Sequence, residues 1–72
     1  MTQAQWKYIL ERVINNAFDA AREAREHPGD AFYEGRRLAC YEMLDTVKNE
    51  LVARGQPLSE FGLDTDLENT VL

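Results

Sequence analysis

Residues 27–30 read HPGD, and this stretch separates two long segments that each predict an α-helix. Pro28 disfavours helical backbone at His27, Gly29 lets the chain turn, and Asp30 can cap a helix that follows. His27 also suits the end of a helix, where an imidazole interacts favourably with the terminal carbonyl groups. A break this short makes the two helices antiparallel neighbours. The stretch therefore predicts an αα-hairpin.

The boundaries of both helices follow from residues on either side of the break. We expect the first helix over about residues 3–27, because Thr2 and Gln5 form a capping-box pattern and no Gly or Pro interrupts the segment after them. The second helix is expected over about residues 31–54, with Gly55 as its C-terminal stop.

The last part of the chain, residues 55–72, is expected to form a tail. The segment PLSEFG, residues 57–62, predicts a short turn, and Thr65 is a candidate cap for a final helical turn. No repeat or linker divides the chain, so residues 1–72 are predicted to form a single all-α domain: an antiparallel helical hairpin with a short C-terminal turn.

Apolar residues on the first predicted helix cover about half of its circumference, which is wider than one partner helix can cover. Ile14 and Phe18 flank the main seam and form part of this surplus. A homodimer that forms a four-helix bundle would bury the surplus, so we expect Ile14 and Phe18 at an interface between two copies. The seam itself has a spacing of three and four and consists of Trp6, Leu10, Val13, Ala17, Ala20 and Ala24.

The second predicted helix has one main apolar face and a sparser apolar line on its back. Leu38, Tyr41 and Val52 form the back line, and exposed apolar area of this kind marks an interface with a protein partner unless the tail covers it. The tail offers Leu58, Phe61 and Leu63 for that purpose. The main face consists of Phe32, Tyr33, Ala39, Cys40, Met43, Leu44, Val47 and Leu51. Trp6 and Tyr33 are expected in the core at the two ends of the hairpin.

Two residues near the start of the second helix do not fit a plain amphipathic pattern. Gly35 costs about 1 kcal/mol relative to Ala inside a helix, which predicts a close approach of another helix. Arg36 lies near the middle of the main apolar face. Its guanidinium either extends over the end of the hairpin to reach water or forms an ion pair with a second copy.

Composition limits the functions that this chain can have. It has 72 residues, of which 44% are hydrophobic and 29% charged, with a formal net charge of -5. One Cys and one His exclude an intramolecular disulfide and a His/Cys zinc cluster. The eight basic residues are scattered, so we expect no direct binding to nucleic acid. The chain has no signal-peptide pattern and no apolar run of membrane-spanning length, so we expect no membrane contact and a cytoplasmic location.

Size favours self-association. A chain of 72 residues buries a smaller fraction of its surface than a larger domain does, and no disulfide or zinc site supplements its core. We therefore expect a homo-oligomer.

Four acidic residues form the strongest candidate for a catalytic site. Glu23-x-x-Glu26 is followed after fifteen residues by Glu42-x-x-Asp45, and residues three apart share a helix face. The pattern resembles the acidic signature of the all-α NTP pyrophosphatases, the MazG-like group, although Arg22 stands where the fuller signature has a further acid. The resemblance implies a Mg²⁺-dependent nucleotide pyrophosphohydrolase in which these four carboxylates hold the metal. Without this site, no cofactor is expected.

Helical geometry places these four acids away from the hairpin's own core. At 100° per residue, Glu23 lies about 110° and Glu26 about 170° from the seam of the first helix. Glu42 and Asp45 lie roughly 150° from the centre of the main face of the second helix. The four carboxylates could therefore meet only across a dimer interface built on the opposite helix faces. The alternative is that they are acids on the solvated faces of the two helices.

The predicted second helix carries a further resemblance. The segment EGRRLACYEMLD, residues 34–45, resembles segments of small uncharacterised bacterial and phage helical proteins, which implies an accessory protein and no particular activity. We expect a non-enzymatic interaction or regulatory module that acts through a helical dimer and protein partners. A third hypothesis is an acidic protein that occupies the basic groove of a nucleic-acid-binding partner.

Overall fold

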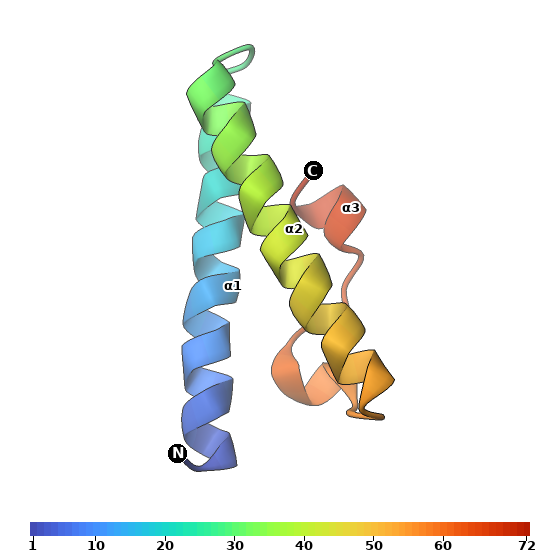
Figure 1. Cartoon of the computed structure of the whole chain (residues 1–72). Helices are drawn as coiled ribbons and strands as arrows, with labels where there is room; N and C mark the ends of the chain where they lie inside the picture. The colour runs from blue at the N-terminus through green and yellow to red at the C-terminus, as the bar shows by residue number, and fades with distance from the viewer.

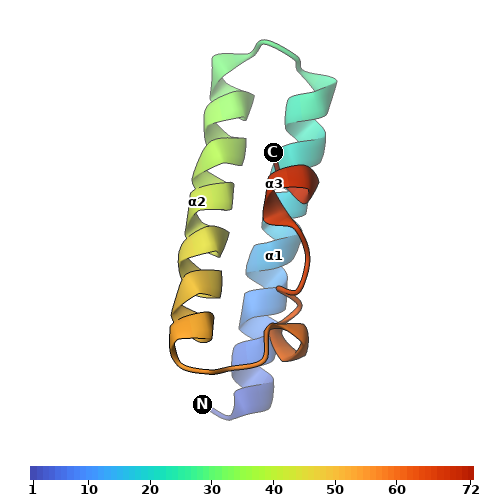
Figure 2. The same cartoon turned by 90° about the vertical axis from the view of Figure 1, so that its right-hand side faces the viewer.

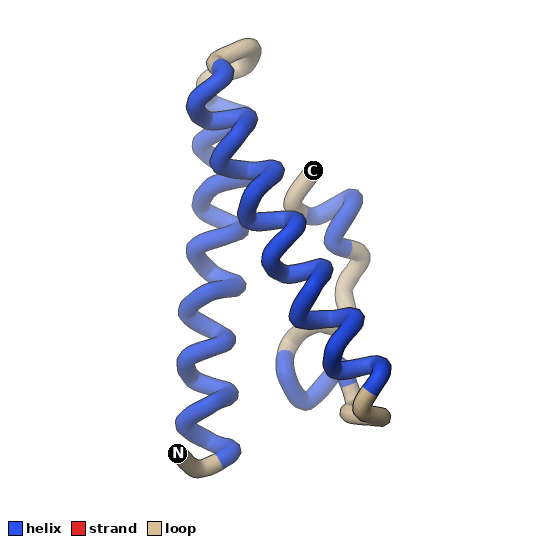
Figure 3. Tube along the Cα trace, viewed as in Figure 1, coloured by secondary structure: helices blue, strands red, loops and turns tan.

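The protein is an all-α helical hairpin with a folded C-terminal tail, as a computed structural model of residues 1–72 shows (Figures 1 and 3). Two long helices, α1 (Gln3–Glu26) and α2 (Ala31–Ala53), are followed by a short 3-10 helix, η1 (Leu58–Phe61), and a final turn of helix, α3 (Leu67–Thr70). No strand is present. The predicted fold class is confirmed, and both long helices end within one residue of their predicted boundaries.

Both ends of α1 are capped as the sequence predicts. The Thr2 hydroxyl accepts from the Gln5 amide at 3.2 Å, and the Gln5 side chain accepts from the Thr2 amide at 2.7 Å. These two bonds satisfy amides that have no partner within the helix. At the other end His27 is the C-cap, and its Nδ1 lies 2.9 Å from the carbonyl oxygen of Glu23.

The hairpin turn between the long helices is short and well supported by local contacts. Gly29 adopts a φ of 81°, which favours glycine. The Asp30 carboxylate caps α2 by accepting from the Phe32 amide at 2.9 Å. The imidazole of His27 stacks on the ring of Tyr33 with 4.0 Å between ring centroids, so aromatic contact joins the end of α1 to the start of α2.

The tail is more extensively folded than predicted. After η1, Gly62 turns the chain with a φ of 72°, and Asp66 caps α3 by accepting from the Glu68 amide at 3.1 Å. The prediction of Thr65 as that cap is wrong, because the carboxylate one residue later takes the role. Figure 2 shows the tail on one face of the hairpin, running back in front of α1 towards the hairpin turn. It forms a second layer on that face.

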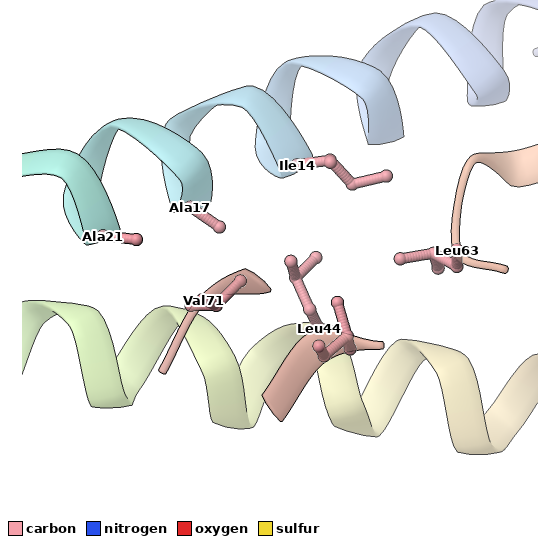
Figure 4. Close-up of a cluster of buried hydrophobic side chains, with 7 residues drawn as sticks. Ile14, Ala17, Ala21, Leu44, Leu63 and Val71 are labelled. Atoms are coloured by element: carbon pink, nitrogen blue, oxygen red, sulfur yellow. The ribbon is translucent and has the colours of Figure 1, made fainter. Parts of the chain in front are cut away.

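The core lies where the tail meets the two long helices. Leu44 of α2 and Leu63 and Val71 of the tail are its largest fully buried side chains (Figure 4). Alanines supply most of the α1 contribution and let the other elements approach closely. The buried cluster consists of Ile14, Ala17, Ala21, Leu44, Leu63, Leu67 and Val71.

The two long helices diverge from the hairpin turn towards the start of α1 (Figure 1). As a result, Trp6, a predicted core residue, and Met43, on the predicted main face, are exposed by 55% and 61%. Ala39 is exposed as well, and Tyr33 is half-buried against His27. The prediction of Trp6 as core is wrong, because one hairpin face near its open end has no element packed on it. Phe32, on the predicted main face, is the second residue of α2 and is 70% exposed beside the hairpin turn.

Candidate functional site

An apolar groove lies between the diverging halves of the two long helices. Its volume is about 470 Å³, and every residue that lines it is hydrophobic. From α1 the lining residues are Trp6, Ile9, Leu10 and Val13, from α2 they are Met43, Val47 and Leu51, and Phe61 contributes from η1.

Side-chain size explains why the groove forms at this end of the hairpin. Near the turn the α1 contacts are made by Ala17, Ala21 and Ala24, each 1% exposed, so the helices approach closely there. Towards the open end the facing positions carry larger side chains, among them Leu10 and Leu51, which hold the helices apart. The tail covers one face of this widened region, and the groove occupies the space on the other side.

The groove continues towards the hairpin turn as a smaller hollow of about 210 Å³. Val13 and Met43 line both cavities, and Asn16, Ala17 and Cys40 complete the smaller one. Cys40 is half-buried, as predicted for a cysteine on the main face of α2. The apolar surface therefore extends over about half the length of the hairpin.

The five interface residues predicted from the sequence are divided between core and surface. Ile14 is a member of the buried cluster, and Phe18 and Tyr41 pack against that cluster while half-buried. Leu38 and Val52 are exposed. They are 14 residues apart on α2, about 21 Å along the helix, and half-buried Tyr41 lies between them. The back of α2 thus presents single apolar side chains and no continuous patch, whereas the groove is continuous.

The two acids predicted on the first helix are both engaged with arginines of the same chain. The Arg36 guanidinium donates a hydrogen bond to the Glu23 carboxylate across the hairpin. Glu26 lies 3.9 Å from Nε of Arg22 on the same helix. An ion pair across the dimer was one of two expectations for Arg36; the structure places this ion pair within one chain instead.

The two acids predicted on the second helix differ in exposure and in their contacts. Glu42 is exposed and forms no ion pair within the chain. Asp45 is half-buried and accepts from the side-chain amide of Asn49 at 3.3 Å. Nowhere do three or more His, Cys, Asp or Glu side chains gather closely enough to hold a metal ion. A Mg²⁺ site shared between two copies stays a prediction.

Carboxylates do gather around Tyr41, on the side of α2 that the tail covers. Partial burial raises the pKa of Tyr41 above its ordinary value of 10.0, and the negative charges of Glu68, Asp45 and Asp66 raise this pKa further. Lys48, one helix turn beyond Asp45, donates to the carbonyl oxygen of Thr65 at 3.2 Å. The hydrogen bond of Lys48 attaches the tail to α2.

Gly35 has no other helix packed against it, contrary to the prediction. A Cβ placed on this residue would meet no atom within 4 Å, so no helix approaches it in the chain. The close approach that the sequence predicted is absent within one copy.

No helix of the structure combines the length and the apolar composition that crossing a membrane requires. Compared with protein-family models, curated proteins and solved structures, the chain has no significant match. Fold and groove together define the protein as a small all-α hairpin with one covered and one uncovered apolar face.

Proposed function

We propose that this protein is a non-enzymatic interaction module that works as a homodimer, with the apolar groove as its pairing surface. The observation that carries the proposal is the groove itself, lined only by hydrophobic side chains and bordered by exposed Trp6 and Met43. Apolar surface of this continuity costs free energy in water and marks a site of association.

The dimensions of the chain support a second copy as the occupant. The structure measures 39 × 21 × 14 Å, and the tail covers only one face of the layer that the two long helices form. Stable domains bury their apolar faces between at least two packed layers. A second copy would supply the missing layer and complete a four-helix bundle.

The structure offers less support for an enzyme or for an acidic mimic of nucleic acid. The pyrophosphohydrolase needs four converging carboxylates, and Glu23 and Glu26 are each paired with an arginine of the same chain. An acidic mimic of nucleic acid needs a concentrated negative surface, and six ion pairs neutralise many of the acids locally. A protein partner at Leu38 and Val52 stays a prediction.

Sedimentation equilibrium over a range of concentrations tests the proposal. Met43→Glu places a charge in the groove, and we expect it to weaken the dimer by at least about 100-fold, because an unpaired buried charge is strongly unfavourable. Val52→Glu is the matched control. Val52 is 58% exposed against 61% for Met43, and a separation of nine positions places it on the opposite side of α2.

Trp6, the single tryptophan, gives an independent signal because any occupant of the groove changes its surroundings. We expect the emission of Trp6 to shift to shorter wavelength over the same concentration range in which the mass doubles. A protein that stays monomeric at every concentration, or a dimer that Met43→Glu leaves intact, would contradict the proposal.

A further inference from the structure

One wall of the groove belongs to the tail. Phe61 of η1 lines the groove, and every other lining residue belongs to α1 or α2. Phe61 also lines a second hollow, together with Lys7 of α1 and with Glu60 and Gly62 of the tail. The ring of Phe61 therefore forms the wall between the two hollows. The shape of the groove thus depends on the position of η1.

Few contacts attach the Phe61 end of η1 to the hairpin. The backbone hydrogen bonds of residues 57–63 all join residues of that segment, so none of them reaches α1 or α2. Leu58, at the start of η1, packs against the buried cluster, whereas Phe61 belongs neither to the cluster nor to the residues packed on it. A segment with few buried contacts opens locally at a small cost in free energy. Phe61 can therefore move out of the groove while Leu58 stays in place.

The α1 helix holds this end of η1 through one charged side chain, Lys7. Its Nζ lies 5.8 Å from the centroid of the Phe61 ring and 3.9 Å from Oε2 of Glu60. The first distance is that of a cation–π interaction and the second that of an ion pair. No other ion pair joins η1 to the hairpin. Because one ammonium group makes both contacts, a single substitution removes both.

Lys7 lies away from the groove itself. It lines the second hollow with Glu11 and Ile14, four and seven residues further along α1, so these three residues share one side of the helix. None of the three lines the groove, whereas the adjacent Trp6 does. Lys7 is therefore not placed to contact an occupant of the groove, and its route to the groove runs through η1.

We infer that η1 is a movable wall of the groove, and that Lys7 is the positioning residue that latches this wall against α1 in the form that pairs with a second copy. The inference rests on the proposed function, because it concerns the same groove, and it names the contact that regulates pairing. When Lys7 holds Phe61 in place, the apolar surface is complete. When the latch is released, the surface loses one wall and fewer chains are in the form that pairs.

The affinity of the dimer, measured by sedimentation equilibrium, tests the latch. Lys7→Gln removes the charge on which both contacts depend. These contacts are partly exposed to water, so we expect about a threefold effect for each copy and a dimer about tenfold weaker, since both copies must be in the pairing form. Lys7→Arg retains the positive charge, and its affinity is expected within about threefold of the original.

A double-mutant cycle with Phe61→Ala tests whether Lys7 acts through the ring of Phe61. Phe61 lies outside the buried cluster, so its removal should leave the fold intact, which circular dichroism checks. Without the ring there is no wall to hold, and we expect Lys7→Gln to change the affinity of the Phe61→Ala variant by less than about twofold. A general loss of stability would instead weaken both dimers equally.

Two further measurements separate the latch from net charge and from the dimer itself. Arg25→Gln changes the formal charge as Lys7→Gln does, but it lies in the last turn of α1, away from the groove, and should leave the affinity within about twofold. At concentrations where the chains are monomeric, the emission of Trp6 should lie at longer wavelength in Lys7→Gln than in the original chain, because Phe61 leaves the groove that both residues line.

The outcomes distinguish the latch from the proposed function. A dimer that Met43→Glu dissociates, while Lys7→Gln leaves its affinity and the emission of monomeric Trp6 unchanged, overturns the latch and keeps the groove as pairing surface. An equal effect of Lys7→Gln with and without the ring of Phe61 also overturns it. A wild-type chain that remains monomeric at every concentration overturns the proposed function and, with it, the role of Lys7 in pairing.

Discussion

Arg36 of α2 donates a hydrogen bond to Glu23 of α1, and this is the one ion pair that joins the two long helices. The pair closes the hairpin on the side of the turn, where α1 and α2 lie nearest to each other. It explains why an arginine occupies the apolar face of α2, since the neighbouring helix presents a carboxylate there. It also engages an acid that a metal site would need.

We predict a small coupling between these two residues. Their side chains are 39% and 34% exposed, so water screens the pair and its contribution to the free energy of unfolding is about 0.5 kcal/mol. A double-mutant cycle with Arg36→Gln and Glu23→Gln, measured by urea unfolding at one fixed protein concentration, gives this coupling. The exposed pair Arg54 and Glu50 is the control, with an expected coupling below about 0.3 kcal/mol. Equal couplings for the two pairs would show that the cross-helix contact has no special role.

The tail is predicted to be essential to the fold. Leu63 is fully buried against both long helices, so Leu63→Ala should lower the free energy of unfolding by about 2–4 kcal/mol through lost contacts and the cavity that remains. Leu72→Ala removes an exposed leucine of the same tail, and its effect should lie within about 0.5 kcal/mol. Chemical unfolding followed by circular dichroism measures both. Similar effects of the two variants would mean that the tail does not pack on the hairpin in solution.

The tail also shows where the sequence was informative and where it was not. Capping residues Thr2 and Asp30 define the starts of the long helices, because a cap acts through bonds to amides two or three residues away. Leu63, Leu67 and Val71 are spaced by four, and this spacing was the available signal for a packed tail. The segment is too short to be stable as an isolated helix, so its structure depends on contacts with α1 and α2.

The groove was not predicted, because it depends on the angle between the helices. Alanines such as Ala17 and Ala21 allow contact near the turn, while the tail and the larger residues beyond it separate the helices at the open end. A helical-wheel argument assumes parallel axes and therefore placed Trp6 and Met43 in the core. The apolar surplus named from the sequence does not form the groove: Ile14 lies in the core and Phe18 packs against it, whereas the groove is lined mostly by residues of the predicted seam and main face.

The stability of the fold should decrease above pH 10 in part through Tyr41. The folded-state pKa of Tyr41 is raised above its ordinary value of 10.0 by partial burial and by Glu68, Asp45 and Asp66. The neutral phenol is therefore favoured by folding, so its contribution is fully present below pH 10 and is lost as the pH rises through the folded-state pKa. Tyr41→Phe cannot ionise, and its melting temperature should fall less steeply over this range than that of the unmodified chain. Parallel curves for the two proteins would contradict a shifted pKa.

Glycines 35 and 62 should respond to substitution in opposite directions. Gly35 lies inside α2 with helical backbone and no atom within 4 Å of an added Cβ, so Gly35→Ala should raise the free energy of unfolding by about 0.5–1 kcal/mol. Gly62 has a φ of 72°, and an added Cβ would lie at an ordinary contact distance of 3.7 Å from Cδ1 of Ile14. Gly62→Ala should therefore destabilise the fold by about 1 kcal/mol through backbone strain, not through a clash.

Urea unfolding of both glycine variants at one protein concentration measures the two effects. The affinity of the dimer formed by the Gly35→Ala variant also tests whether a second copy packs against this residue. If a second copy packed against this residue, Gly35→Ala would weaken association and the stabilisation would disappear at high concentration. Because Gly35 lies outside the groove, we expect the dimer affinity to remain unchanged and the gain in stability to persist at all concentrations. Destabilisation by Gly35→Ala would instead mean that another helix approaches the chain at this point.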